Sequence, residues 1–275
     1  MHARKTILDE IVDTERPVTC ICPESPVVCR KDSGIKDVLK IMLGKKYRKL
    51  PVLDKSGRLK GVITSVDMLN LLGGGEKHRI FRRCRESLRA KIEKFMTDRA
   101  ATIEPKTSIG EAADVFRKEG RGFYPVADSG RIVSVVSEWD IVKLLKKPTG
   151  IKVYEVMSER PIVARGDYTV YDTAKMICRG GFRRLPVVEN GILTGIVTPT
   201  DILNHFIRGG SKNLLHDATP LEMIMKKNVV TVSPDEDIFS AVKTMKGRRV
   251  GGMPVVEDEE LLGIITERDI LDVIA

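Results

Sequence analysis

One pattern recurs four times along the chain, and it constrains the fold more than any single motif. Each copy is an apolar stretch that runs into Thr or Ser, two further residues and Asp. The copies are GVITSVD at 61–67, SVVSEWD at 134–140, GIVTPTD at 195–201 and GIITERD at 263–269. A Pro-Val pair precedes each Asp, with its Pro 15 residues before the Asp in three copies and 16 in the first. Such a fixed recurrence indicates a chain built from repeated structural units.

The order of elements within one repeat follows from the fourth copy. Residues 229–232 form a short β-branched run, which favours a strand. Residues 237–247 carry apolar side chains at helical spacing and end in Gly, so they are predicted to form a helix. Two strands are predicted at 253–257 and 261–266, joined by an acidic turn, with a second helix at 267–275. The repeat is therefore β-α-β-β-α, and at about 60 residues it needs a partner to bury enough apolar surface.

The three residues before each Pro alternate in character between odd and even copies. They are RKL at 48–50, GFY at 122–124, RRL at 183–185 and GGM at 251–253. The alternation indicates that a two-repeat module was itself duplicated. The predicted repeats are 1–72, 73–148 with a basic linker helix, 149–208 and 209–275, with the first two and the last two forming modules.

Composition bounds the class of protein. Hydrophobic residues make up 42% of the 275 residues, enough for a buried core. No run of about eighteen apolar residues occurs and no apolar signal region follows the N-terminus, so a cytoplasmic protein outside the membrane is expected. Five scattered cysteines fit a reducing compartment. Cys20-x-Cys22 with Cys29 lacks a fourth ligand at zinc spacing, so no metal site is expected.

The net charge of +9 is concentrated in one segment, residues 75–95, where eight Lys and Arg face three Glu. This segment has two interpretations, a solvated linker helix or a surface that binds nucleic acid. No helix-turn-helix or zinc-finger signature accompanies it, and aromatic residues are 5% of the chain, few for base stacking. The linker interpretation is the simpler one.

The Thr-x-x-Asp motif also has two interpretations. It matches a capping box, in which Thr198 is the N-cap, Pro199 the first helical residue and Asp201 the acid at N3. The start of a helix is in addition an anion site, because its free N–H groups and partial positive charge face outward. Basic pairs before Pro suit phosphate oxygens, and a short carboxylate suits the two hydroxyls of a ribose. Both interpretations use the same location.

The four motifs in register resemble the CBS domain, and two such domains in tandem form a Bateman module. The chain is similar to stand-alone four-CBS proteins of archaea and to the γ subunit of AMP-activated protein kinase. The resemblance implies an α/β (α+β) fold with four CBS units paired into two Bateman modules, in a pseudo-symmetric disc. It also implies that the motif Asp holds ribose, that Thr or Ser and the basic pair reach phosphate, and that the end of the first strand borders adenine.

Carried onto this sequence, the resemblance implies a set of site residues for each repeat. They are Asp201, Thr198, Thr200, Arg183, Arg184 and Ala164 in repeat 3; Asp67, Thr64, Arg48, Lys49 and Cys29 in repeat 1; Asp269, Thr266 and Val232 in repeat 4; and Asp140 and Ser137 in repeat 2. Repeat 2 departs most from the pattern, since Ser134 replaces Gly, Trp139 precedes Asp140 and Phe123 replaces a basic residue. Its site is expected to be weak, empty or altered in ligand choice.

The predicted function is a non-catalytic sensor that binds AMP, ADP or ATP and passes its occupancy to a partner protein such as a kinase or metabolic enzyme. An S-adenosylmethionine-binding regulator and a nucleic-acid-binding regulator are the alternatives. An enzyme is disfavoured, because the four His align with no repeat position and no P-loop or nucleotide-binding glycine fingerprint is present. The resemblance leaves the oligomeric state open, because CBS modules often pair into homodimers and a chain of four units can form the disc alone.

Overall fold

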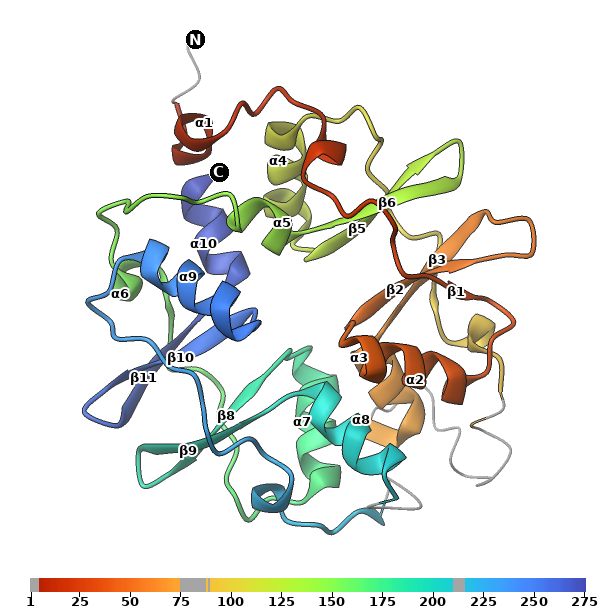
Figure 1. Ribbon diagram of the computed structural model, residues 1–275. Coiled ribbons are helices and arrows are strands. Elements are labelled where there is room, and N and C mark those ends of the chain that lie inside the picture. Colours follow the sequence, from red (N-terminus) through yellow and green to blue (C-terminus); the bar gives the residue numbers. More distant parts are fainter. Residues whose placement is uncertain (1–4, 75–87, 89, 210–215) are drawn as a thin grey trace. The chain divides into compact units, whose positions relative to one another are not determined.

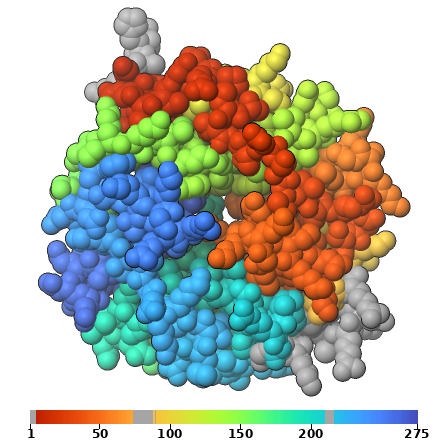
Figure 2. All heavy atoms as spheres, viewed as in Figure 1, coloured from red at the N-terminus to blue at the C-terminus, as the bar shows by residue number. Residues whose placement is uncertain are grey.

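The computed structural model describes residues 5–74, 88, 90–209 and 216–275, and it shows a mixed α+β protein (Figure 1). The chain divides into two compact units. The first consists of Met1–Pro26, Ala101–Pro161 and Val230–Ala275, and the second of Val27–Ala100 and Ile162–Val229. Figure 2 shows red, green and blue atoms of the first unit in contact, although they are far apart in the sequence. Each unit thus combines segments that are far apart in the sequence. The exact repeat boundaries stay a prediction.

The second unit contains repeats 1 and 3. Repeat 1 comprises β1 (Cys29–Arg30), α2 (Ile35–Lys45), β2 (Lys49–Leu53), β3 (Leu59–Thr64), α3 (Ser65–Leu69) and the π-helical turn η2 (Asn70–Gly74). Repeat 3 comprises α7 (Val170–Gly180), β8 (Leu185–Glu189), β9 (Ile192–Val197) and α8 (Pro199–Ile207). The short elements η5 (Ile92–Lys94), β4 (Thr97–Asp98) and η7 (Leu221–Met223) belong to the same unit.

The first unit contains repeats 2 and 4, and the N-terminal helix packs with them. Repeat 2 comprises α4 (Ile109–Glu119), β5 (Phe123–Asp128), β6 (Arg131–Ser137) and α5 (Glu138–Val142). Repeat 4 comprises α9 (Ile238–Arg248), β10 (Gly252–Glu257), β11 (Glu260–Thr266) and α10 (Glu267–Ile274). The remaining elements are α1 (Ile7–Ile11), η1 (Val18–Cys20), α6 (Val153–Val156) and β7 (Ser158–Glu159).

The predicted strand over 229–232 is wrong, because only Val232 pairs, as a single parallel bridge with Val255. The N–H of Val232 donates to the carbonyl of Pro254, and Val256 donates to the carbonyl of Val232. Extending this ladder toward the N-terminus would need a donor at Pro254, which has no N–H. The Pro of the Pro-Val pair therefore limits the first strand of the repeat.

The other elements of repeat 4 confirm the prediction from periodicity, with shifted ends. The helix expected to end at Gly247 continues to Arg248, and Arg249 closes it with a φ of 55°. The acidic turn between β10 and β11 is made by Asp258 and Glu259, both at positive φ. The order β-α-β-β-α is thus present, with the first β reduced to one residue.

Each unit has its own hydrophobic core, formed by the apolar faces of helices from both of its repeats. In the second unit, Leu39 of α2 and Ile177 of α7 are fully buried in one cluster. In the first unit, Phe116 of α4 and Met245 of α9 are buried in the other. One repeat alone buries little apolar surface, so the packing of two repeats against each other provides a core large enough for a stable fold.

A short segment lies ahead of the first helix of each repeat, and three of the four segments add to the sheet of another repeat. We call residues 22–24, 96–98, 157–159 and 225–227 the lead segments. In antiparallel pairs, β4 joins β3 and β7 joins β11, and Lys226 forms a bridge with Ile196 of β9. Repeats 1, 3 and 4 therefore each receive a strand-like segment from elsewhere in the chain.

The glycine that begins the motif makes this addition possible. A Cβ at Gly61 would overlap the backbone carbonyl of Thr97, and one at Gly263 would lie 2.9 Å from the carbonyl oxygen of Ser158. In repeat 2 the position is Ser134, and its hydroxyl donates to the carbonyl of Pro23 instead. The change from Gly to Ser thus replaces backbone pairing by one side-chain hydrogen bond.

Most of the basic segment 75–95 lies outside the described residues. Its described C-terminal part contains the 3₁₀ turn η5 rather than the predicted α-helix. No helix in the described part of the chain is long and apolar enough to cross a membrane.

Candidate functional site

All four motif acids cap the helices that follow them, as the capping-box interpretation predicts. In each repeat the backbone N–H of Thr or Ser donates to Oδ2 of the Asp at 2.7–2.9 Å, and the hydroxyl donates to the same oxygen at 2.6–2.7 Å. The pairs are Thr64–Asp67, Ser137–Asp140, Thr198–Asp201 and Thr266–Asp269. One carboxylate oxygen is therefore used by the fold, and Oδ1 is the oxygen on which the repeats differ.

The partner of Oδ1 comes from a lead segment in two repeats. In repeat 3, Nζ of Lys226 lies 3.2 Å from Oδ1 of Asp201. In repeat 4, the hydroxyl of Ser158 donates to Oδ1 of Asp269 at 3.2 Å. Burial raises the pKa of Asp269, although the hydrogen bonds from Thr266 oppose the shift. The ammonium of Lys226 and the neutral hydroxyl of Ser158 thus occupy equivalent positions beside Oδ1 of the motif Asp.

The basic pairs lie beside the motif, as the sequence predicts. In repeat 1, Lys49 stands directly opposite Thr64 in the β2–β3 ladder. In repeat 3, Leu185 pairs with Val197, so Arg184 adjoins Thr198 where the strands end. This register places a basic residue next to the helix start.

The exposure of the repeat 3 residues suits a polar ligand. Asp201 is buried, with 9% of its surface exposed, whereas Arg183 is exposed and Arg184, Thr198 and Thr200 are half-buried. A buried carboxylate beside accessible cations can combine one directed hydrogen-bond acceptor with several anion-binding groups.

The residues expected near adenine turn their side chains into the cores. Cys29 and Ala164 are buried in the core of the second unit, and Val232 in that of the first. The N–H of Ala164 donates to the carbonyl of Pro186, and its own carbonyl accepts from Val188. These three side chains pack into the hydrophobic cores. A contact between these residues and adenine stays a prediction.

Repeat 2 has a different arrangement around its acid. Nζ of Lys143 donates to Oδ1 of Asp140 at 2.8 Å and to the carbonyl of Ile21 at 3.0 Å. Phe123 stands opposite Ser137, where repeat 1 has Lys49, and Trp139 packs against the core. The acid of this repeat is thus engaged by a lysine of its own repeat, at the C-cap of α5.

The cysteines and acids do not gather into a metal site in the described residues, where no group of three or more potential ligands lies together. Cys20 is exposed, while the thiol of Cys22 donates to the carbonyl of Val18. Burial raises the pKa of Cys22 to about 12, so this thiol holds its proton at neutral pH.

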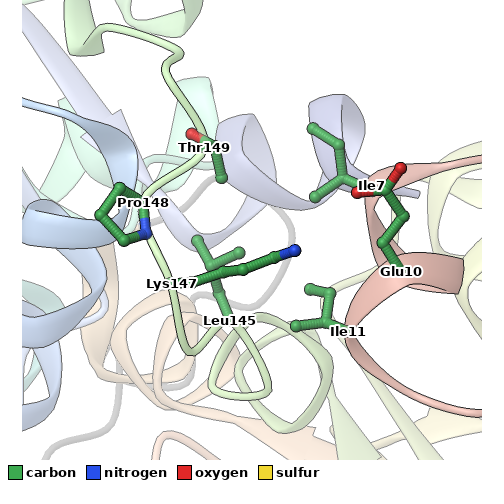
Figure 3. Close-up of a pocket in the computed structure, with 7 residues that line it drawn as sticks. All are labelled: Ile7, Glu10, Ile11, Leu145, Lys147, Pro148 and Thr149. Carbon is green, nitrogen blue, oxygen red and sulfur yellow. The ribbon is translucent and has the colours of Figure 1, made fainter.

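A groove of about 150 Å³ lies apart from these motifs, in the first unit. Figure 3 shows Lys147 extending from the loop after α5 toward α1. Its lining residues are Ile7, Glu10, Ile11, Leu145, Lys147, Pro148 and Thr149. None of the predicted site residues borders it.

The family comparison decides what kind of repeat this is. The model of the CBS domain matches residues 18–74, 92–147, 153–208 and 221–275. The chain belongs to the CBS-domain family. Protein MJ1225 of Methanocaldococcus jannaschii is 30% identical over 256 residues, covering 86% of this chain and 91% of the relative. An uncharacterized 33.4 kDa protein of Thermofilum pendens is 29% identical, covering 89% and 86%.

Two solved structures share the fold of the chain. The crystal structure of MJ1225, proposed as an archaeal homologue of g-AMPK, matches with a TM-score of 0.86 and 29% identity, covering 94% of this chain and all of that one. A Pyrococcus horikoshii protein of 20% identity shares the fold, with a TM-score of 0.62 over 94% of this chain.

The lead-segment residues were missed from the sequence, although a signal for them exists. Pro23, Thr97, Ser158 and Lys226 each stand 28 residues before the Pro of a CBS repeat. A repeat alignment extended this far would align them. It would not show that Ser158 and Lys226 each contact the Asp of another repeat, because that follows only from the strand pairing.

Proposed function

We propose that this chain is a non-catalytic regulator that binds adenine nucleotides, AMP, ADP or ATP, at its CBS repeats and modulates a partner protein. The observation that carries the proposal is the geometry of repeat 3. There a buried carboxylate has one oxygen fixed by the helix cap, and Arg184 of the basic pair adjoins Thr198. The carboxylate suits ribose hydroxyls, and the cations suit phosphate.

Repeats 1 and 3 carry the basic pair and form the better phosphate sites. Repeat 4 keeps the acid, but Gly252 stands opposite Thr266, so its phosphate contacts must come from other residues. Sites of unequal quality would let the protein compare ligands, and occupancy would favour one arrangement that the partner recognises.

Phosphate-binding residues favour nucleotides over S-adenosylmethionine, which has no phosphate. MJ1225, proposed as an archaeal homologue of g-AMPK, supports a regulatory role of this kind. The alternative of nucleic-acid binding rests on the basic segment 75–95, most of which lies outside the described residues, so no structural observation favours it.

Calorimetric titration with AMP, ATP and S-adenosylmethionine tests the proposal. We expect both nucleotides to bind the wild-type chain, and Asp201→Asn to remove the repeat 3 contribution. Asp167→Asn is the matched control, because this exposed acid of repeat 3 pairs with Arg165 away from the motif. If no nucleotide binds up to millimolar concentration, the proposal is wrong.

A further inference from the structure

Lys226 lies at the carboxylate proposed to hold ribose, yet it comes from outside repeat 3. Its backbone exchanges two hydrogen bonds with Ile196, at 2.9 and 3.0 Å. Ile196 lies in the strand that leads into Asp201. The position of Lys226 is therefore fixed by the sheet, while 62% of its side chain remains exposed and can move.

The side chain of the residue before Lys226 packs against the motif glycine. A Cβ on Gly195 would lie 2.9 Å from Cγ of Met225 and closer still to its sulfur. Gly195 thus leaves room for the Met225 side chain beside the strand that pairs with Lys226.

Repeat 3 alone has a cation at this sequence position. The equivalent residues are Pro23, Thr97 and Ser158. At the repeat 4 acid the residue is the neutral Ser158, whose hydroxyl lies 3.2 Å from Oδ1 of Asp269. The same scaffold thus presents two different chemical groups to two otherwise matching acids.

We infer that Lys226 is a specificity-determining residue that makes the repeat 3 site favour phosphate-bearing nucleotides over uncharged nucleosides; this inference rests on the proposed function. Ribose hydroxyls that donate to Oδ1 of Asp201 compete with Lys226 for that oxygen. A nucleoside offers the displaced ammonium no other anion. A nucleotide carries its own phosphate, with which the ammonium forms a new charge-assisted contact.

Isothermal calorimetry with adenosine and AMP measures this preference. The titrations use the full chain carrying Asp67→Asn, Asp140→Asn and Asp269→Asn, so that repeat 3 is the one site with its acid intact. We expect Lys226→Ser to lower the ratio of the adenosine Kd to the AMP Kd about fivefold, in keeping with an exposed ion pair. Lys227→Ser removes the same charge one residue away and should leave the ratio unchanged.

The reciprocal exchange uses repeat 4. Ser158→Lys, in a chain whose other three motif acids are Asn, should raise the same ratio at the repeat 4 site. Circular dichroism confirms that each variant is folded.

Two failures are distinguishable. If the background chain with Lys226 intact binds neither adenosine nor AMP, the proposed function fails at this repeat. If it binds both and Lys226→Ser changes the two affinities equally, or no more than Lys227→Ser does, the role of Lys226 is refuted.

Discussion

Lys143 donates to Oδ1 of Asp140 at 2.8 Å, so in repeat 2 a side chain of the same repeat occupies the oxygen proposed to accept from ribose. The same lysine also donates to the carbonyl of Ile21, which ties it to the N-terminal segment. At the equivalent helix position, repeats 1 and 3 have Asn70 and Asn204. The acid of repeat 2 is thus present but already engaged.

Replacing this lysine should open the repeat 2 site. In a chain whose other three motif acids are Asn, we expect Lys143→Asn to tighten adenosine binding about tenfold, because the carboxylate loses its internal partner. Thermal unfolding with and without adenosine measures the gain through the ligand-dependent rise in Tm. Lys146→Asn, an exposed neighbour, is the control, and an equal response of both variants would contradict the prediction.

The motif glycine should be intolerant of any side chain. Gly61→Ala places a Cβ against the carbonyl of Thr97, so β4 must shift, at a cost of about 1–3 kcal/mol in the free energy of unfolding. Gly44→Ala, on the exposed side of α2 with no atom within 4 Å of the added Cβ, should stabilise by about 0.5–1 kcal/mol. Urea denaturation measures both, and a neutral Gly61→Ala would count against the close approach.

The ion pair between Glu138 and Arg268 joins repeats 2 and 4 within the first unit. Glu138 is fully buried and its Oε1 lies 2.6 Å from Nη2 of Arg268, although the two groups are not aligned as a hydrogen bond. Glu138→Leu leaves the guanidinium with the longer ion pair to Asp272, at 3.7 Å, and the carbonyl of Phe116, and should cost about 3 kcal/mol. Adding Arg268→Met should recover most of this loss in a double-mutant cycle followed by urea unfolding. Additive losses would show that the two residues do not interact.

Burial of Cys29 gives the stability of the protein a pH dependence at the alkaline end. Burial raises the pKa of this thiol from 9.0 to about 12. The folded chain therefore keeps a proton that the unfolded chain releases, so the contribution of Cys29 to stability is complete below pH 9 and is lost as the pH rises toward 12. The free energy of unfolding should fall by up to about 1.4 kcal/mol per pH unit in this window.

Comparison with Cys29→Ala isolates this effect, because lysine and tyrosine titration is common to both chains. The difference in unfolding free energy between the two proteins should shrink from pH 9 to pH 11. A constant difference would show that the thiol ionises equally in both states.

Local patterns in the sequence predicted most of the fold, but they did not predict which side chains contact the motif acids. Helical spacing placed α9 to within a residue or two, and Thr-x-x-Asp spacing predicted the cap at Asp201, because both depend on residues a few positions apart. The prediction of a strand before Ser233 was wrong because the strand would need a backbone donor at Pro254, which has none and lies in another strand. Lys226 was missed for a related reason: its contact with Asp201 depends on pairing with Ile196, 30 residues earlier in the chain.

The lead segments also bear on how such a chain can evolve. Repeat 2 lends its lead segment to repeat 1, and repeats 3 and 4 lend theirs to each other, while Pro23, ahead of repeat 1, accepts a hydrogen bond from repeat 2. A gene fragment encoding one repeat would carry a lead segment whose partner repeat is absent. It would also lack the lead segment that pairs with its own sheet. Two consecutive repeats are the smallest stretch of chain in which every lead segment has its partner. This agrees with the alternation of basic and glycine-containing triplets before the prolines.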